Sequence, residues 1–397
     1  MTSQEIKRLD SQHVMQTYGR FDVALDHGIG ATLYSPEGKA YIDFTSGIGV
    51  NSVGYGNRAW ADAIYAQALK LGHISNLYYT EPYAKLAELL TARSGMSRVF
   101  FANAGGEANE GIIKLARKYS HDKYGESNPN RNVIVTLLQS FHGRTVTTLA
   151  ATGQEHFHKH FFPFTEGFRH VPANDLAAVT AEIERGDVCA VFVELIQGEG
   201  GVLPLDPTYV KALRELCSAR DVLLLADEVQ TGIGRTGELF AFQKYGILPD
   251  AATFAKGIAG GLPMGGVLAA KSCDTTLAAG DHATTFGGNP IAAAAAVEVL
   301  RQLDDDALAK VTENGQYIRD TVASWGFANV VETRGAGLMI GVQVTGTPKD
   351  YVLQCIERGL LLLTAGSDAL RILPPLTITR AEIDAGLAIL KEVLANN

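Results

Sequence analysis

Short apolar segments alternate with helical patterns between residues 98 and 270, and this alternation constrains the fold more than any other feature of the sequence. The segments are rich in Val, Leu, Ala and Phe, which is typical of strands buried on both faces. Between two of them, Ala108, Ile112, Leu115, Ala116 and Tyr119 recur at helical spacing. Strands that alternate with helices predict an α/β fold, in which helices cover a mostly parallel sheet. The strands that we expect are Arg98–Ala102, Asn132–Leu137, Ala190–Ile196, Val222–Ala226, Ala251–Ala255 and Gly266–Ala270.

The sequence changes character after Asn289-Pro290, where an alanine-rich stretch follows. Alanine favours helices and proline is well tolerated in a first helical turn, so we expect a helix that leads out of the large domain. The remainder mixes helical segments with the short strands Leu338–Val344 and Leu370–Leu373, which predicts a smaller α+β domain. We expect a large domain at residues 51–290, a linker helix and small domain at 291–397, and an N-terminal segment at 1–50 that packs with the small domain.

Charge and composition exclude several classes of protein. The 397 residues include 34 Lys and Arg against 43 Asp and Glu, and this net charge of −9 repels nucleic acid. The four cysteines are far apart, which predicts neither a disulfide framework nor a zinc knuckle. No apolar stretch is long enough for a membrane span, and the first residues lack the apolar core of a secretory signal. We expect a cytoplasmic protein without nucleic-acid or membrane partners.

Glycine is overrepresented, at 42 of 397 residues, which directs attention to loops where the backbone approaches a ligand. One such loop, Asn103-Ala104-Gly105-Gly106, joins the expected strand Arg98–Ala102 to a helix. The free N–H groups at the start of a helix favour a phosphate group. A plain glycine turn between a strand and a helix gives the same pattern, so this segment alone leaves both interpretations open.

Two further strands end in residues that can do chemistry. Asp227 and Glu228 follow Val222–Ala226, at the edge where open α/β sheets bind ligands. They resemble the acidic strand end of a P-loop ATPase, but the G-x-x-x-x-G-K-[ST] loop is absent, and a solvated carboxylate pair is the alternative. Lys256 follows Ala251–Ala255 and precedes a glycine-rich turn. If Lys256 is partly buried, its amine would be a nucleophile toward a carbonyl group. If it is exposed, it would be an ordinary surface lysine.

Together these three segments supply what pyridoxal phosphate requires: an anion site, an acid for the pyridinium nitrogen and an amine for the aldehyde. A fourth segment, Ser140–Thr145, adds Phe141 as an aromatic plane and Arg144 for a carboxylate. The combination is far more specific than any one of its parts.

In these motifs the chain resembles the class III (fold type I) pyridoxal-phosphate aminotransferases, closest to the acetylornithine and succinylornithine group. The resemblance implies a fold type I PLP-transferase, pyridoxal 5′-phosphate as cofactor, and a homodimer with shared active sites. It covers nearly the whole chain. The motifs are Thr17–Arg20, Asn103–Asn109, Ser140–Thr145, Gln197–Gly201, Asp227–Gly237, Thr284–Pro290 and Arg371–Leu376.

The resemblance assigns the cofactor site residue by residue. Lys256 would bind the aldehyde of the cofactor and then move a proton, and Asp227 would keep the pyridine nitrogen protonated. Phe141 would stack on one ring face. The remaining implied contacts are Gly105 and Gly106 at the phosphate, Glu228, Val229 and Gln230 beside the ring, and Thr285 reaching the phosphate from the neighbouring subunit.

The resemblance also implies a substrate site with two arginines, Arg144 and Arg371, because a long ω-amino donor and 2-oxoglutarate place carboxylates at two distances. Glu199 would act as a switch that masks Arg371 while the donor binds. Tyr18 would line the donor pocket, and Thr284 would face the substrate.

The sequence departs from the family pattern at three places. Gly106 stands where many relatives carry Thr or Ala, which predicts a weaker hold on the phosphate. Leu195 replaces a usual Pro, and Tyr55-Gly56-Asn57-Arg58 replaces a common His-x-His-Pro stretch. None of these changes removes a catalytic group.

The expected reaction moves the terminal amino group of N-acetylornithine to 2-oxoglutarate and yields N-acetylglutamate semialdehyde and glutamate. Related class III enzymes that use succinylornithine, succinyl-diaminopimelate, ornithine or 4-aminobutyrate are the alternative. A non-catalytic binding protein with the same fold is an alternative of another class. We expect no metal site: the alternating imidazoles of His156, His158 and His160 lack a neighbouring acid or Cys ligand, and Asp304-Asp305-Asp306 lacks the spacing of a calcium loop.

Overall fold

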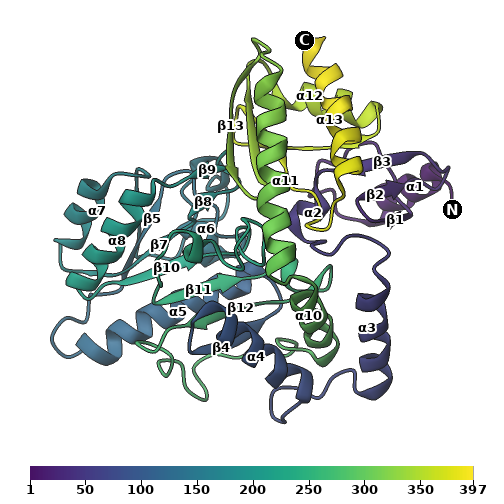
Figure 1. Cartoon of the computed structure of the whole chain (residues 1–397). Coiled ribbons are helices and arrows are strands. Elements are labelled where there is room, and N and C mark those ends of the chain that lie inside the picture. Colours follow the sequence, from purple (N-terminus) through teal and green to yellow (C-terminus); the bar gives the residue numbers. More distant parts are fainter. Residues whose placement is uncertain (397) are drawn as a thin grey trace.

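The computed structural model describes residues 1–396, and a seven-stranded sheet lies at its centre (Figure 1). Its β12 is antiparallel to both neighbours, and the other adjacent pairs are parallel. The prediction of an α/β fold with a mostly parallel sheet is therefore confirmed. In spatial order the strands are β4 (Arg98–Ala102), β12 (Gly265–Ala269), β11 (Ala251–Phe254), β10 (Leu223–Asp227), β7 (Val188–Val193), β5 (Val133–Leu137) and β6 (Phe168–Val171).

The predicted bounds of one strand were wrong. The segment Ala190–Ile196 does not run through as a single strand, because β7 ends at Val193. Ile196 belongs to the separate β8 (Ile196–Gln197), which pairs antiparallel with β9 (Leu203–Pro204). The break places Glu194 and the β8–β9 hairpin at the end of the sheet where the neighbouring loops also gather. The strand β6 was not among the predicted ones.

The central sheet is buried on both faces because its apolar residues alternate between two clusters. On β10, Leu223 and Leu225 pack with residues of α5 (Gly105–Tyr124). Leu224 and Ala226 point to the opposite face, where α8 (Pro207–Ala219) contributes Val210 and Leu213. This two-residue period is what a strand covered on both sides requires.

A second sheet carries the C-terminal part of the chain. It is antiparallel, in the order β13 (Val330–Ala336), β14 (Met339–Val344), β17 (Ala369–Ile372) and β16 (Leu363–Ala365). The helices α11 (Asp305–Ser324), α12 (Pro348–Glu357) and α13 (Arg380–Ala395) accompany it (Figure 1). The predicted alanine-rich helix is α10 (Pro290–Gln302), capped by Asn289, and it packs against α3 (Arg58–Lys70) and α4 (Glu81–Ser94).

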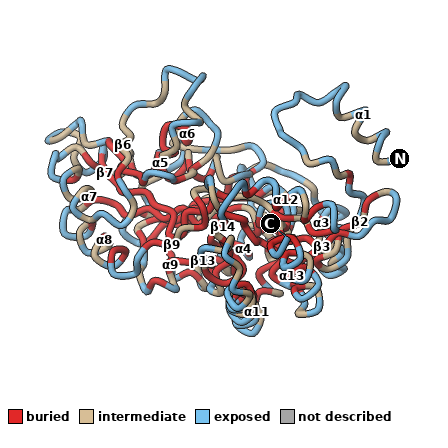
Figure 2. Tube along the Cα trace, turned by 90° about the horizontal axis from the view of Figure 1, so that it is seen from above, coloured by how far each residue is buried: buried red, intermediate tan, exposed pale blue. Residues whose placement is uncertain are grey.

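The N-terminal segment joins residues from the far end of the chain. Strands β1 (His27–Ile29), β2 (Thr32–Tyr34) and β3 (Ala40–Asp43) form a small sheet, and β3 pairs in parallel with β15 (Leu360–Leu361). Helix α1 (Ser3–His13) buries none of its residues and projects from the body of the molecule (Figure 2), with Ser3 at its start donating two hydrogen bonds to Glu37 in the turn before β3. The remaining elements are α2 (Ser46–Gly49), α6 (Val146–Ala151), α7 (Leu176–Ile183), α9 (Ala241–Lys244), and the 3-10 helices η1 (Glu155–Phe157) and η2 (Lys256–Ala259).

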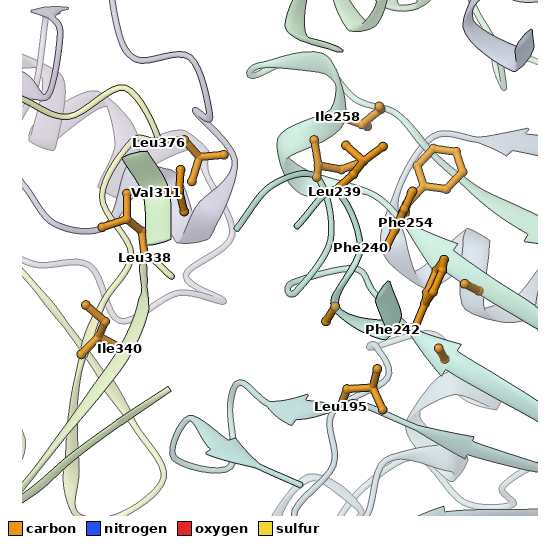
Figure 3. Packing of buried hydrophobic residues seen from close by; sticks show 14 of the residues in the cluster. Leu195, Leu239, Phe240, Phe242, Phe254, Ile258, Val311, Leu338, Ile340 and Leu376 are labelled. Carbon is orange, nitrogen blue, oxygen red and sulfur yellow. The ribbon is translucent and has the colours of Figure 1, made fainter. Parts of the chain in front are cut away.

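One continuous hydrophobic cluster joins the two sheets. Phe240, Phe242 and Phe254 pack near the central sheet, whereas Ile340 lies on β14 of the C-terminal sheet and Leu338 in the turn before it (Figure 3). Because the packing is shared, the loops at the ends of β10 and β11 are held against the C-terminal strands. This arrangement positions the cavities described next.

Candidate active site

A cavity of about 400 Å³ lies where the loops after β4, β5, β10 and β11 meet. Its volume falls in the range typical of small-ligand sites. The structure brings many of the sequence-predicted residues into its wall, although they come from distant parts of the chain. Those lining it are Gly105, Gly106, Phe141, Asp227, Val229, Gln230 and Lys256.

The first turn of α5 presents backbone N–H groups at this cavity. The helix begins at Gly105, and Ala104 at its N-cap provides no side-chain hydrogen bond. The N–H groups of a first turn have no acceptor within their own helix, and they favour an anion. A Cβ added to Gly105 would lie 2.6 Å from Cγ1 of Val229, so only glycine fits without displacing Val229. At Gly106 the nearest atom would be 3.6 Å away, which leaves room for a methyl group.

Asp227 is a buried carboxylate with several hydrogen-bond donors. Its Oδ2 accepts from Asn109 Nδ2 at 2.8 Å and lies 2.8 Å from His142 Nδ1, while Oδ1 accepts the N–H of Val229 at 3.0 Å. Burial acts to raise the pKa of Asp227, but the hydrogen bond and charge of His142 outweigh it and bring the pKa below its ordinary value. Asp227 is therefore held ionised in the cavity wall.

Lys256 begins η2 directly after β11, with a left-handed φ of 45°. A residue other than glycine is rare in this conformation, which occurs most often where the surrounding structure enforces it. Burial lowers the pKa of Lys256 below that of a free lysine, against the opposing charge of Glu199. A lowered pKa increases the fraction of neutral, nucleophilic amine.

Glu199 and Arg371 form a bidentate ion pair between the β8–β9 hairpin and β17. Nη1 of Arg371 lies 2.5 Å from Oε1 of Glu199, and Nη2 lies 3.3 Å from Oε2. Gln230 accepts a third bond from Arg371 at 3.2 Å. Burial acts to raise the pKa of Glu199, but the Arg371 charge outweighs it and the pKa lies below its ordinary value. Gln230 therefore connects this pair to the cavity that it lines.

Three residues of the site were missed by sequence reasoning. Glu194 accepts the N–H of Phe141 at 2.8 Å and that of Gly198 at 3.2 Å, and burial, with a contribution from Asp227, raises its pKa to about 8. His142 and Asn109 both bond Asp227, and His142 stacks on a phenylalanine ring of β7. Asn109 and His142 lie inside motifs quoted above. The signal in the sequence that could have identified them is a polar residue at a position where the surrounding pattern is apolar.

Several predicted residues lie outside the cavity wall. Glu228 accepts hydrogen bonds from the N–H groups of Ala241 and Phe242 and from Thr231, so it caps the first turn of α9 rather than lining the cavity. Arg144 is exposed and lies over the ring of Phe157 at 4.0 Å. Tyr18 is 73% exposed on the N-terminal segment.

Thr284 and Thr285 lie on the far side of the β4–α5 turn. Thr284 accepts a hydrogen bond of 2.8 Å from Asn103, which lines the cavity, whereas Thr285 is exposed. Thr285 lies beside His73, Asn76 and Tyr78 in a small outer depression. The Thr285 side chain therefore does not line the cavity of its own chain.

A second, polar cavity of about 720 Å³ adjoins the ion pair. Glu199 lines it together with Arg334 of β13, Gln139, His156 and Asp368. This space lies between the β8–β9 hairpin and the C-terminal sheet. In the described part of the chain, residues 1–396, no group of His, Cys, Asp and Glu side chains is arranged to hold a metal ion.

The comparisons with known proteins agree with this geometry. A family model for class III aminotransferases matches residues 14–394. Acetylornithine aminotransferase of Haemophilus ducreyi is 51% identical over 397 residues, covering 100% of both chains, and that of Caldanaerobacter subterraneus is 45% identical, covering 97% of this chain and 98% of the relative.

Solved structures resemble the whole chain. The ornithine aminotransferase of Toxoplasma gondii superposes with a TM-score of 0.95 at 31% identity, covering 100% of this chain and 96% of the other. The N-acetylornithine aminotransferase of Stenotrophomonas maltophilia has a TM-score of 0.85 at 36% identity, covering 98% of each. The expected resemblance is confirmed, and the chain belongs to the class III aminotransferase family.

Proposed function

We propose that this protein transfers the terminal amino group of N-acetylornithine to 2-oxoglutarate in arginine biosynthesis, with pyridoxal 5′-phosphate as cofactor. The products are N-acetylglutamate semialdehyde and glutamate. The observation that carries the choice of donor is the full-length similarity to acetylornithine aminotransferases, at 51% identity for the H. ducreyi protein.

The residues of the cavity fit the cofactor. The N–H groups of α5 at Gly105 and Gly106 suit a phosphate, and the absence of a Cβ at Gly105 leaves Val229 in its place beside them in the cavity wall. Asp227 is an ionised, buried partner for a pyridinium nitrogen, with Val229 beside it and Phe141 in the wall as an aromatic surface. Bound pyridoxal phosphate supplies an aldehyde that reacts with amines and a ring that withdraws electrons.

Lys256 is the proposed acid and base. Its amine would hold the aldehyde of the cofactor in the resting enzyme, and with the donor bound Nζ would accept the proton from the carbon that carries the donor amino group. The lowered pKa of Lys256 supports this role, because a base must be neutral before it can accept a proton. Asp227 retains its negative charge throughout.

Arg371 and Arg144 are the proposed clamps for substrate carboxylates. While the donor binds, Glu199 neutralises Arg371, so that the end of the donor with the ω-amino group, which has no carboxylate, is accepted there. When 2-oxoglutarate enters, Glu199 releases Arg371, which then binds the α-carboxylate. Arg144, held over the ring of Phe157, binds the carboxylate at the far end of the substrate. Thr284 and Tyr18 remain proposed substrate contacts, and Glu228 supports the first turn of α9 rather than the cofactor.

A homodimer with shared sites is part of the proposal. Thr285 faces outward beside a group of exposed apolar side chains, including Leu77, Tyr78 and Phe286. Such a surface favours association with a second copy of the chain. In that arrangement Thr285 bonds the phosphate in the partner's cavity.

We also propose that the enzyme works in the cytoplasm. Its four cysteines are unpaired, as expected in a reducing compartment. No helix within residues 1–396 is long and apolar enough to cross a membrane.

The visible spectrum of the cofactor-loaded protein tests the proposal. The protein is mixed, without keto acid, with N-acetylornithine, succinylornithine, ornithine, succinyl-diaminopimelate and 4-aminobutyrate in turn. We expect the absorbance of the lysine-bound cofactor to disappear fastest with N-acetylornithine. Faster loss with ornithine would support the likeness to ornithine aminotransferases instead. No absorbance band after loading would support a binding protein without this cofactor.

A further inference from the structure

The loop that carries Glu199 is fixed to the C-terminal sheet through its backbone. The carbonyl of Glu199 accepts the N–H of Gly366 at 2.8 Å, and the carbonyl of Gly201 accepts Nε–H of Arg334 at 2.9 Å. Arg371 lies on β17 of that same sheet. Because the backbone is held at Glu199 itself and again two residues later, Glu199 can leave Arg371 by rotating its side chain while this part of the loop stays in place.

The second cavity provides the space for this rotation. Glu199 lines it, and its volume of about 720 Å³ is much larger than a carboxyl group. Its wall is mostly polar or backbone, with Gln139, Gln154 and Ser367 among its members. A carboxylate that turns away from Arg371 therefore enters a space with hydrogen-bond donors.

A carboxylate that leaves a bidentate arginine in a partly buried site needs another cation, because an unpaired charge there is costly. Among the described residues that line the second cavity, Arg334 is the one arginine or lysine. Its Nη1 donates to Glu332 at 2.6 Å and to Gln343 at 3.5 Å. Its Nη2 forms an ion pair with Asp368 Oδ1 at 3.7 Å, a distance too long for a hydrogen bond. This end of the guanidinium retains donors for another carboxylate.

Arg334 also lies close to the Glu199 loop. A Cβ added to Gly201, whose φ is +127°, would be 3.0 Å from Nη2 of Arg334. The absence of a side chain at Gly201 thus lets the guanidinium approach the loop two residues beyond Glu199.

We propose that Arg334 is the second partner of Glu199: the carboxylate pairs with Arg371 while the amino donor binds, and with Arg334 while Arg371 binds the 2-oxo acid. This inference rests on the proposed function, since it presupposes the Glu199 switch. Arg334 is a positioning residue that acts through Glu199 and touches no reacting atom. It lowers the free energy of the state in which Arg371 is open.

Binding of glutarate to the cofactor-loaded enzyme tests the proposal, since this dicarboxylate has no keto group to react and still requires an open Arg371. Calorimetry would compare the wild type with Arg334→Met, Glu199→Gln and the double variant. We expect Arg334→Met to weaken glutarate binding about tenfold or more and Glu199→Gln to tighten it. In the Glu199→Gln background, Arg334→Met should change the affinity less than twofold.

The double variant separates this role from a structural one. If Arg334→Met weakens glutarate binding equally with and without Glu199, Arg334 acts through the fold and the proposal is wrong. An Arg334→Met enzyme with wild-type affinity would also overturn it. If Glu199→Gln leaves glutarate binding unchanged, the switch itself fails, and the proposed function loses its two-substrate mechanism as well.

A second variant keeps the test decisive if Arg334→Met folds poorly, which its thermal midpoint would reveal. Glu332→Gln removes the carboxylate that competes for Nη1 of Arg334 and leaves the bond to Gly201 in place. We expect it to bind glutarate more tightly than the wild type, and weaker binding would contradict the proposal. Steady-state kinetics should show the Arg334→Met effect in KM for 2-oxoglutarate rather than in the half-reaction with the donor.

Discussion

His142 Nδ1 lies 2.8 Å from Asp227 Oδ2, although 85 positions separate the two residues. The imidazole is buried, it stacks on Phe192 with ring centroids 4.2 Å apart, and among residues 1–396 its Nε2 has no hydrogen-bond partner. The ring is therefore fixed in orientation and holds the carboxylate that faces the cavity.

Replacement of His142 by Phe should impair the site without unfolding the protein. Asp227 would lose a charge-assisted hydrogen bond worth about 1.5–3 kcal/mol, so we expect kcat/KM to fall roughly 10- to 150-fold. The pKa of Asp227 would rise toward its ordinary value. As the pH is lowered, the variant should therefore lose activity at a higher pH than the wild type does. The exposed His160→Ala is the matched control and should change kcat/KM less than twofold. Equal losses in both variants would contradict a specific role for His142.

Lys256→Ala should abolish turnover. Loss of an acid–base group alone typically costs 10²–10⁴-fold in rate, and Lys256 is also the proposed attachment point. The check is donor turnover together with mass spectrometry of the borohydride-reduced, cofactor-loaded protein. We expect the cofactor to be attached covalently in the wild type and not in the variant. Equal activity of the two proteins would mean that chemistry at Lys256 is not the function.

The two neighbouring glycines at the start of α5 should respond differently to alanine. Gly105→Ala places a Cβ 2.6 Å from Cγ1 of Val229, so it should displace the valine and weaken cofactor binding. Gly106→Ala adds a methyl group with 3.6 Å to its nearest neighbour and should leave binding and stability within about 1 kcal/mol of the wild type. Fluorescence titration of the apoprotein with pyridoxal phosphate would measure both. The prediction fails if Gly106→Ala is the more damaging change.

Stability should fall as the pH drops from 6.5 toward 4 because of His170. Burial, with smaller contributions from the charges of His158 and His142, lowers the pKa of His170 to about 4. Between pH 4 and 6.5 the unfolded chain therefore binds more protons at this residue than the folded one. The free energy of unfolding should decrease by up to roughly 3 kcal/mol over this range, at about 1.4 kcal/mol per pH unit.

His170→Gln removes this titration. Urea unfolding of the two proteins at several pH values should give a flatter pH dependence for the variant between pH 4 and 6.5. Parallel curves for the two proteins would show that His170 has no lowered pKa.

Phe286→Asp should prevent association of two chains. Phe286 is 59% exposed and lies near the ring of His73, with centroids 5.2 Å apart, next to Thr285. A carboxylate at this place would be costly to bury against a partner. We expect a dimer for the wild type and a monomer with weak cofactor binding for the variant in sedimentation experiments. Glu126→Gln, at an exposed position after α5, should remain dimeric.

The sequence allowed much of the central sheet and of its chemistry to be predicted. Five of the six expected strands from 98 to 270 agree with observed ones to within a residue or so, because a strand covered on both faces must be apolar throughout. The segments of Gly105, Asp227 and Lys256 were predicted to serve one cofactor, and the three residues line one cavity because each follows such a strand and the carboxyl ends of parallel strands share an edge.

The supporting residues could not be predicted in the same way. Glu194 lies inside a segment expected to be one strand. One of its partners, the N–H of Phe141, comes close only because β5 and β7 lie side by side. The other, the N–H of Gly198, comes close only because the strand ends before Glu194. The pairing of Glu199 with Arg371, 172 positions apart, came from a family resemblance rather than from spacing. Glu228 follows an apolar strand just as Asp227 does, but adjacent residues of an extended segment point to opposite sides, and its carboxylate turns to the first turn of α9.

The parallel pairing of β3 with β15 also fixes how long β3 waits for its partner strand during synthesis of the chain. Ile42 finds its partner Leu360 only after 318 further residues have been synthesised. At 5–20 residues per second this is roughly 15 to 60 s, much longer than a hairpin needs to form. During that interval one edge of β3 has no native strand beside it, so the backbone N–H and C=O groups of that edge stay open to water and to other extended segments.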